Sequence, residues 1–342
     1  MDHRVTGELP GWAVVAGGAG FIGSHLCRAL LDRGFEVICL DNLLTGTEIN
    51  LRDCRADGRF HWLRHDVTAP LDPSALPAAP DGALNLIFHL ASPASVVDYL
   101  RLPLQTLLVN SEGTRHLLEL ARHTGARFLY ASTSEVYGDP LEHPQREDYW
   151  GNVNPNGERS VYDEAKRFGE ALVMHYVRAE GVDARIARIF NTYGPHSRPH
   201  DGRVVPNLLT QALNGEPFTI YGDGSQTRSF CYVSDLVDGI LAAMLMEGTT
   251  GEVFNLGNPD EYTINTFAGV IERLVGRTVQ REYKPLPVDD PGRRRPDISK
   301  ARRILGWEPR VGVEEGLRRT AEWFMELAGR EKPAGLGARS ER

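Results

Sequence analysis

Short apolar runs alternate with longer amphipathic stretches over residues 1–190 of the chain. The apolar runs are typical of buried strands, which we expect at residues 12–16, 36–40, 60–65, 85–90, 127–131 and 184–189. Between them, apolar residues recur at helical spacing, which predicts helices at residues 20–33, 103–124 and 160–180. Strands that alternate with helices predict an α/β fold, a doubly wound parallel sheet with helices on both faces.

After residue 190 the pattern changes, because Gly and Pro become frequent and the apolar runs become shorter. We therefore expect a larger domain at residues 11–190 and a smaller, mixed α/β substrate domain at residues 191–330. A helical pattern at residues 230–246 indicates that the chain returns to the first domain, with a segment near residues 228–247 completing the sheet. Residues 1–10 and 331–342 have the composition of flexible tails.

The charge of the chain does not favour a nucleic-acid or membrane partner. The 342 residues carry a net charge of −8, and no basic run dominates. No apolar stretch approaches the roughly 20 residues of a membrane-spanning helix, and no signal peptide is recognisable. The four cysteines lack metal-like spacing, so we expect no metal site and buried thiols in a reducing, cytoplasmic environment.

At the first junction of strand and helix, the sequence VVAGGAGFIGSHL supplies a glycine-rich loop that contains Gly17, Gly20, Phe21, Ile22 and Gly23. Glycines let the backbone approach a pyrophosphate, which the helix N-terminus also favours. Asp41 ends the next strand, where a carboxylate accepts hydrogen bonds from ribose hydroxyls and repels a 2′-phosphate. We therefore expect a Rossmann-type domain that binds NAD in preference to NADP. Asp66 and Val67, after the third strand, are either adenine contacts or part of a plain loop.

Tyr162 and Lys166 lie four residues apart, on one face of a predicted helix. An ammonium near the phenol, together with a positive nicotinamide, favours the phenolate. Tyr162 is then a plausible base that removes a hydroxyl proton while a hydride leaves for NAD. Ser132 and Thr133 follow the fifth predicted strand, and their hydroxyls can hydrogen-bond the same substrate oxygen.

These motifs together resemble the extended short-chain dehydrogenase/reductase family of nucleotide-sugar enzymes. The shared segments are GGAGFIG, STSEVYG, the Tyr162 and Lys166 pair, and RIFNTYGP; longer ones, such as STSEVYGDP, YDEAKR and YGDGSQTRSFCYVSDLVDG, resemble the UDP-glucuronic acid decarboxylases of that family. The resemblance covers roughly residues 12–325. It implies permanently held NAD, UDP-glucuronic acid as substrate, and a homodimer through a four-helix bundle, for which the helices at residues 103–124 and 160–180 are suitable.

The resemblance also implies which residues form the site. Catalytic roles fall to Thr133, Glu135, Tyr162, Lys166 and Arg228. Cofactor contacts fall to the glycine loop and to Asp41, Asn42, Asp66, Val67, Leu90, Ala91, Ser92, Ser132, Tyr162, Lys166 and Arg203. Substrate contacts fall to Asn191, Tyr221, Gln226, Arg228 and Arg294, with Arg294 at the diphosphate. The chain departs from the family pattern at Leu108 and Val109, where a lysine and a threonine are usual.

Ser134 and Glu135 bear on the choice of reaction. Oxidation of a glucuronic acid at C4 places the C6 carboxylate β to a ketone, so carbon dioxide leaves without protonation of a leaving group by the protein. A 4,6-dehydratase must expel the C6 hydroxyl, usually with an Asp-Glu pair, and Ser134 stands at the Asp position. We therefore expect decarboxylation of UDP-glucuronic acid to UDP-xylose through a 4-keto intermediate, with internal recycling of bound NAD.

Two other readings of the sequence remain open. Some dehydratases carry a similar Thr-Ser-Glu, so a nucleotide-sugar 4,6-dehydratase or 4-epimerase is the alternative enzyme. A catalytically silent NAD-binding regulatory protein is the alternative from another class, although Thr133, Tyr162 and Lys166 are all present.

Overall fold

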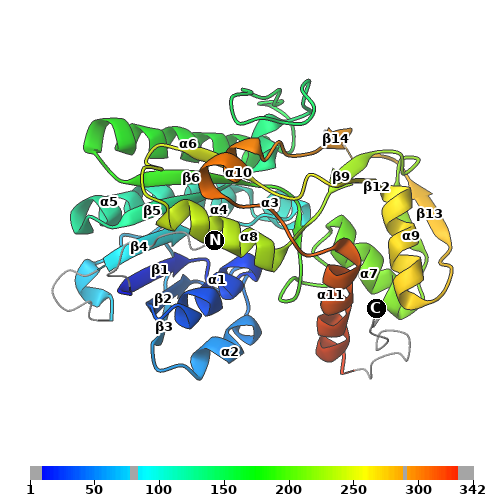
Figure 1. Ribbon diagram of the computed structural model, residues 1–342, viewed down its shortest axis with the longest axis horizontal. Coiled ribbons are helices and arrows are strands. Elements are labelled where there is room, and N and C mark those ends of the chain that lie inside the picture. The colour runs from blue at the N-terminus through cyan, green and yellow to red at the C-terminus, as the bar shows by residue number, and fades with distance from the viewer. Residues whose placement is uncertain (1–9, 78–83, 288–290, 330–342) are drawn as a thin grey trace.

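The computed structural model describes residues 10–77, 84–287 and 291–329, so the expected tails lie outside the described residues apart from Pro10. A seven-stranded sheet forms the centre, in the order β11-β6-β5-β4-β1-β2-β3 (Figure 1). Its strands are β1 Trp12–Ala16, β2 Glu36–Asp41, β3 Phe60–Arg64, β4 Leu84–His89, β5 Arg127–Thr133, β6 Ala184–Ile189 and β11 Val253–Leu256. Every neighbouring pair is parallel, which confirms the predicted doubly wound Rossmann-type sheet.

Helices cover both faces of the sheet, because successive strand residues point to opposite sides. Val15 and Cys39 pack in the core that contains α1 (Phe21–Asp32) and α8 (Val233–Leu245). Val14, Ile38 and Ile87 pack in the other core, which contains α5 (Thr114–Thr124) and α6 (Ser160–Glu180). Shorter helices are α2 Arg52–Arg55, α3 Val96–Arg101, α4 Pro103–Leu108 and the turns Glu48–Leu51, Pro73–Ala75 and Ser134–Tyr137.

The helix predicted at residues 103–124 is interrupted by one wide turn. α4 continues through a π turn at Val109–Gly113 into α5. Asn110 within this turn is buried and donates to the Thr106 carbonyl oxygen at 2.8 Å, and it accepts from the Tyr130 hydroxyl at 2.9 Å. The sequence analysis predicted one continuous helix here and did not anticipate this turn, which is of the rare π type.

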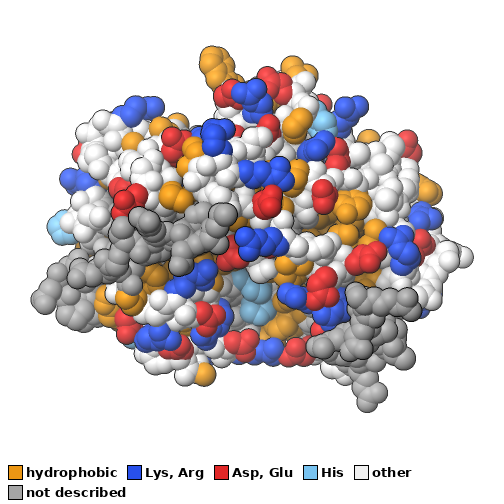
Figure 2. Space-filling view, in the orientation of Figure 1, with side chains coloured by type: hydrophobic (Ala, Val, Ile, Leu, Met, Phe, Trp, Pro, Cys, Tyr) orange, Lys and Arg blue, Asp and Glu red, His pale blue; other side chains and the backbone are white. Residues whose placement is uncertain are grey.

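The chain after residue 190 forms smaller elements. Its helices are α7 Val204–Asn214, α9 Ile264–Val275, α10 Ser299–Leu305 and α11 Val313–Leu327. Of these, α7, α9 and α11 lie at the right of Figure 1, whereas α10 packs against α8 and β11. Its small sheets pair β7 Thr192–Tyr193 with β10 Cys231–Tyr232, β9 Thr227–Ser229 with β12 Glu261–Thr263 and β14 Arg293–Arg294, and β8 Phe218–Tyr221 with β13 Arg281–Lys284. Acidic and basic side chains are interspersed over the face shown in Figure 2.

The segment expected near residues 228–247 does return to the large sheet, but as a helix. α8 begins at Val233, because Cys231 and Tyr232 pair with β7 instead of extending the helix. The strand that completes the sheet is β11, which lies beyond that segment and pairs with β6.

Gly169 allows α6 to lie close to the sheet, which gives a stability prediction. A Cβ at this position would lie 2.1 Å from the hydroxyl oxygen of Tyr130, a fully buried side chain. We expect Gly169→Ala to lower the free energy of unfolding by about 1–3 kcal/mol, as overpacking does. Gly269→Ala is the matched control on α9, because nothing lies within 4 Å of its Cβ position; it should raise the value by about 0.5–1 kcal/mol. Denaturant unfolding of both variants checks this, and equal effects would contradict it.

Candidate active site

The glycine loop joins β1 to α1 with almost no space for side chains. Gly17 has φ +82°, and a Cβ there would lie 2.7 Å from the backbone nitrogen of Ala91. A Cβ on Gly23 would lie 2.1 Å from the Gly17 carbonyl oxygen. The cradle therefore suits a ligand that lies directly against the backbone, and the first turn of α1 presents its N–H groups there. A dinucleotide pyrophosphate fits these donors.

Asp41, the last residue of β2, accepts two backbone hydrogen bonds that shape the loop. Its Oδ2 accepts from the Ala19 nitrogen at 2.9 Å, and its Oδ1 accepts from the Leu43 nitrogen at 2.7 Å. Burial raises the pKa of the Asp41 carboxyl, and these two hydrogen bonds oppose that rise. Each carboxylate oxygen has a second lone pair, so the same group can also accept from a ribose hydroxyl.

A cavity of about 110 Å³ beside Asp41 gathers the residues expected at the adenosine end. Asn42 donates to Oδ2 of Asp66 at 3.0 Å. The lining also contains Val67, Leu90, Ala91 and Ser92. Leu108 and Val109, the two departures from the family pattern, line this same cavity.

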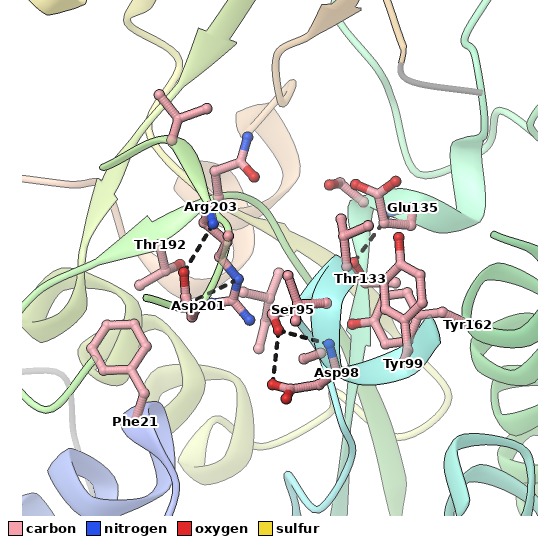
Figure 3. Close-up of a pocket in the computed structure, with 18 of the residues that line it drawn as sticks. Phe21, Ser95, Asp98, Tyr99, Thr133, Glu135, Tyr162, Thr192, Asp201 and Arg203 are labelled. Atoms are coloured by element: carbon pink, nitrogen blue, oxygen red, sulfur yellow. Dashed lines mark hydrogen bonds and ion pairs between the residues drawn. The ribbon is translucent and has the colours of Figure 1, made fainter. Parts of the chain in front are cut away.

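A second, larger cavity of about 450 Å³ is lined by residues from both parts of the chain (Figure 3). Its lining includes the predicted catalytic residues Thr133, Glu135, Tyr162, Lys166 and Arg228, the predicted cofactor residues Ser132 and Arg203, and the predicted substrate residues Asn191, Tyr221, Gln226 and Arg294. The two cavities share Gly17 and Gly20 of the loop. The fold therefore brings every predicted site residue to one continuous region.

Tyr162 is buried on α6, and the ring of Tyr99 stacks on it with 4.9 Å between the ring centroids. Burial raises the pKa of Tyr162 to about 12, although a hydrogen bond with Thr133 and the charge of Arg203 oppose that rise. The protein's own groups therefore leave the phenol neutral near pH 7. The phenolate expected from the sequence needs further positive charge beside the ring.

Lys166 is held at the end of β5, one helical turn from Tyr162. Its Nζ donates to the Ala131 carbonyl oxygen at 2.8 Å and lies 5.9 Å from the centroid of the Tyr162 ring. Burial lowers the pKa of Lys166 to about 7, and the charge of Glu170 opposes this shift. Glu170 also accepts from the Ser132 hydroxyl at 2.5 Å, so the hydrogen of that hydroxyl is already used in a bond within the protein.

Glu135 lies between two arginine side chains. Arg159 donates to its Oε2 at 2.6 Å, and Arg294 lies 3.4 Å from the same oxygen. Burial raises the pKa of Glu135, but the charges of Arg294, Arg159 and Arg228 outweigh burial and hold it at about 2. The pKa of the nearby Asp163 is raised to about 7, by burial and then by Glu135, so Asp163 offsets only part of the positive charge.

Arg294 contacts the stretch STSEVYG directly. It donates to the carbonyl oxygen of Ser134 and to that of Gly138, the latter at 3.0 Å. The sequence comparison with the family implies a diphosphate contact for Arg294, whereas in the folded chain its nearest charged neighbour is Glu135. The Ser134 side chain is buried in the cavity lining, where a hydroxyl replaces the carboxyl of an Asp-Glu pair.

The remaining substrate-side residues lie on and around β9. Arg228 is 8% exposed and donates to the Thr227 carbonyl oxygen at 2.8 Å. Gln226 donates to the Tyr221 carbonyl oxygen at 2.7 Å, and the Tyr221 ring is 39% exposed. Arg228 therefore reaches the interior of the cavity, while Tyr221 and Gln226 lie nearer its mouth.

The lining residues that sequence reasoning missed include Tyr99, Asp98, Arg159 and Arg198. Arg159 had a usable signal, because it stands three residues before Tyr162 and therefore on the same side of the helix. Tyr99 and Asp98 lie in the segment SVVDYL, where nothing distinguishes them from the pattern of a short surface helix. Arg198 is placed by tertiary contacts alone.

The geometry, a glycine cradle for a dinucleotide beside a Tyr-Lys pair, agrees with the comparisons to known proteins. A family model described as the NAD dependent epimerase/dehydratase family matches residues 13–257. The chain belongs to this family. One relative is UDP-glucuronic acid decarboxylase 1 of Arabidopsis thaliana, which is 52% identical over 91% of this chain and 69% of the relative. Another is UDP-glucuronic acid decarboxylase 1 of Danio rerio, which is 49% identical over 91% of this chain and 72% of the relative.

Solved structures of the epimerase/dehydratase family have the same fold. The UDP-glucuronic acid 4-epimerase of Bacillus cereus, in complex with UDP-glucuronic acid and NAD, aligns with a TM-score of 0.81 and 29% identity, over 93% of this chain and all (100%) of that one. These findings confirm the predicted family and NAD as its cofactor. Among the described residues, no helix is long and apolar enough to cross a membrane.

The depressed pKa of Glu135 predicts how stability depends on pH. Its folded pKa of about 2 lies below the ordinary value, so its contribution is present above about pH 4.3 and is lost as the pH falls towards 2. We expect Glu135→Gln to be less stable than the wild type at pH 7, with a difference that shrinks at acidic pH.

Denaturant unfolding at several pH values measures this difference. Glu315→Gln is the control, because the pKa of Glu315 is also about 2 but the side chain is 42% exposed beside Arg318. Solvent screens that pair, so its pH-dependent difference should be smaller. The same difference at pH 7 and at acidic pH for Glu135→Gln would contradict the assignment.

Proposed function

We propose that this protein decarboxylates UDP-glucuronic acid to UDP-xylose, with NAD bound at the glycine loop. The observation that carries the proposal is the excess of positive charge at the reactive end of the larger cavity. Three guanidinium groups, those of Arg159, Arg228 and Arg294, act on the one carboxylate of Glu135. A sugar with a C6 carboxylate brings the negative charge that suits this surplus, and a planar guanidinium binds a carboxylate in two places. The decarboxylase relatives support the same substrate.

Oxidation at C4 begins with Tyr162. Thr133, at the end of β5, and Tyr162, on α6, lie on either side of the position for the C4 hydroxyl, and Tyr162 removes its proton. NAD, when bound, accepts the C4 hydride and later returns it, so the reaction has no net redox change. Positive charge from Lys166 and from the bound nicotinamide favours the phenolate that Tyr162 needs.

Decarboxylation follows from the chemistry of a β-keto acid. The C5–C6 bond breaks, carbon dioxide leaves, and the electron pair moves into the C4 carbonyl. Fixed hydroxyl donors, Thr133 and Tyr162, stabilise the resulting enolate oxygen. Arg228 holds the carboxylate before it departs, and Glu135 directs a water molecule that protonates C5. Ser134 favours this course over the elimination of a C6 hydroxyl, because a serine supplies no carboxyl for acid catalysis.

We assign the cofactor and substrate contacts as follows. The NAD contacts are Gly17, Gly20, Phe21, Ile22, Gly23, Asp41, Asn42, Asp66, Val67, Leu90, Ala91, Ser92, Ser132, Tyr162, Lys166 and Arg203, all of which line the two cavities. The substrate contacts are Asn191, Tyr221, Gln226, Arg228 and Arg294. The buried carboxylate of Asp41 disfavours a 2′-phosphate, which supports NAD over NADP.

We propose a homodimer formed through a four-helix bundle of the helices at residues 103–124 and 160–180 from two copies. α4 and α6 leave large apolar side chains in solvent: Leu104 is 68% exposed, Phe168 52% and Leu107 39%. Such a cluster on neighbouring helices is typical of a surface that another protein covers. We also propose two domains, at residues 11–190 and 191–330. We propose a cytoplasmic location, because the four cysteines are free and buried, which is compatible with a reducing compartment.

The test of the function is the product formed from UDP-glucuronic acid in deuterated water. We expect UDP-xylose and carbon dioxide, with one deuterium at C5 and none at C4, without added NAD beyond what the protein binds. Mass spectrometry and proton NMR of the product check each point. A product that keeps all six sugar carbons would overturn the proposal and support the 4-epimerase or 4,6-dehydratase alternative.

Removal of the Tyr162 hydroxyl tests the base. We expect Tyr162→Phe to lower turnover by about 10²–10⁴-fold, the usual value of a positioned proton-transfer group, with little change in nucleotide-sugar binding. Tyr176→Phe makes the same chemical change on the same helix, where the hydroxyl bonds Glu119 at 2.5 Å outside both cavities. Kinetics and calorimetric binding of both variants give the answer. Turnover of Tyr162→Phe within a few-fold of Tyr176→Phe would reject the assignment.

A further inference from the structure

Residues 194–203 form one wall of the larger cavity, whose lining includes His196, Arg198, Asp201, Gly202 and Arg203. At the cofactor side they contact α1, where His196 Nδ1 lies 2.8 Å from the Ser24 hydroxyl and His25 Nε2 lies 2.9 Å from the Pro195 carbonyl oxygen. Farther along, Arg198 forms an ion pair with Asp98 on α3. The wall is therefore held beside α1, where Asn50 also donates to the His196 carbonyl oxygen at 3.3 Å, and separately at α3.

The two attachments differ in kind. Burial lowers the pKa of His196 to about 3, so its contact with α1 is a neutral hydrogen bond. The contact with α3 is ionic, between the Arg198 side chain, which is 42% exposed, and the Asp98 side chain, which is 5% exposed. Ion pairs with an exposed partner respond to salt and exchange with solvent, whereas buried neutral bonds do so much less.

Asp98 keeps partners when Arg198 moves away. Its Oδ2 accepts from the Ser95 hydroxyl at 2.7 Å, and its Oδ1 accepts from Arg101 at 3.3 Å (Figure 3 shows the Ser95 contact). The separation of Arg198 from Asp98 therefore does not leave a buried carboxylate without hydrogen bonds, which would be costly. This contact is the easier of the two to open.

The ion pair also lies beside the reacting residues. Asp98 precedes Tyr99, whose ring stacks on Tyr162. On the Arg198 side of the ion pair, Arg203 lies in the same wall, and its positive charge opposes the rise that burial causes in the pKa of Tyr162. When the Arg198–Asp98 ion pair breaks, the wall is thus free to move away from α3 and from the Tyr99 and Tyr162 rings beside it.

We propose that the Arg198–Asp98 ion pair is a latch that retains the oxidised sugar and the reduced cofactor until the hydride has returned. The inference rests on the proposed function, because a closed redox cycle needs both species to stay in place between its two hydride transfers. Arg198 and Asp98 are positioning residues in this scheme, and they take no part in the bond changes.

The first test compares Arg198→Gln with Arg101→Gln. Both variants remove one guanidinium from the same carboxylate, but Arg101 is 62% exposed on α3 and does not belong to the wall. With UDP-glucuronic acid, we expect Arg198→Gln to raise the share of turnovers that end in free 4-keto sugar and reduced nicotinamide by about three- to tenfold. Arg101→Gln should match the wild type. Arg198→Lys, which keeps the charge, should restore part of the retention.

A second readout does not depend on turnover. The exchange of bound NAD for labelled NAD, measured by rapid filtration, should be faster in Arg198→Gln than in Arg101→Gln, and raised salt should accelerate exchange in the wild type more than in Arg198→Gln. Equal release and equal exchange in the two variants, at unchanged unfolding midpoints, would overturn the latch. A difference in exchange without any decarboxylation would keep the latch and overturn the proposed function instead.

Discussion

A buried carboxylate stays ionised only where nearby positive charge replaces its lost hydration. In this protein, arginine side chains keep the buried carboxylate of Glu135 ionised, and the arrangement of the larger cavity depends on that interaction. Its partners come from distant parts of the chain: Arg159 lies 24 positions away and Arg294 lies 159 positions away. Removal of one member of such a buried pair commonly costs about 3–5 kcal/mol. The contacts of Arg159 and Arg294 with Glu135 therefore join the end of β5, the start of α6 and the strand β14 into one unit.

Much of the larger domain is predictable from sequence, because its elements are defined by local patterns. Apolar runs predicted β1 and β6 to the residue, and the glycine loop and Asp41 follow from the connection of β1 through α1 to β2. β5 extends through Ser132 and Thr133, two residues farther than its apolar run, because polar residues can continue a ladder whose apolar positions have ended. Tyr162 and Lys166 were recognisable because helical spacing alone places both on one face.

Contacts between distant segments escaped prediction, since they have no local signature. The stacking of Tyr99 on Tyr162, the ion pair of Arg198 with Asp98, and the place of Arg294 beside Glu135 all depend on how separate elements pack. The π turn at Val109–Gly113 was missed for a different reason, because a buried Asn110 in a helix interior is compatible with several geometries. Sequence reasoning therefore anticipated the grouping of Tyr162 and Lys166 better than the contacts that surround this pair.

The late position of Arg294 has a consequence for synthesis of the protein. Domains of a nascent chain fold from the N-terminal end as they emerge from the ribosome. The glycine loop, Tyr162 and Lys166 emerge first, and β11 (Val253–Leu256) then completes the sheet, all before the strand Arg293–Arg294 exists. A growing chain is thus able to assemble its dinucleotide half while the carboxylate of Glu135 still lacks its most deeply buried partner. Translation order separates the two halves of the site in time, and a product truncated before residue 293 would hold only the first.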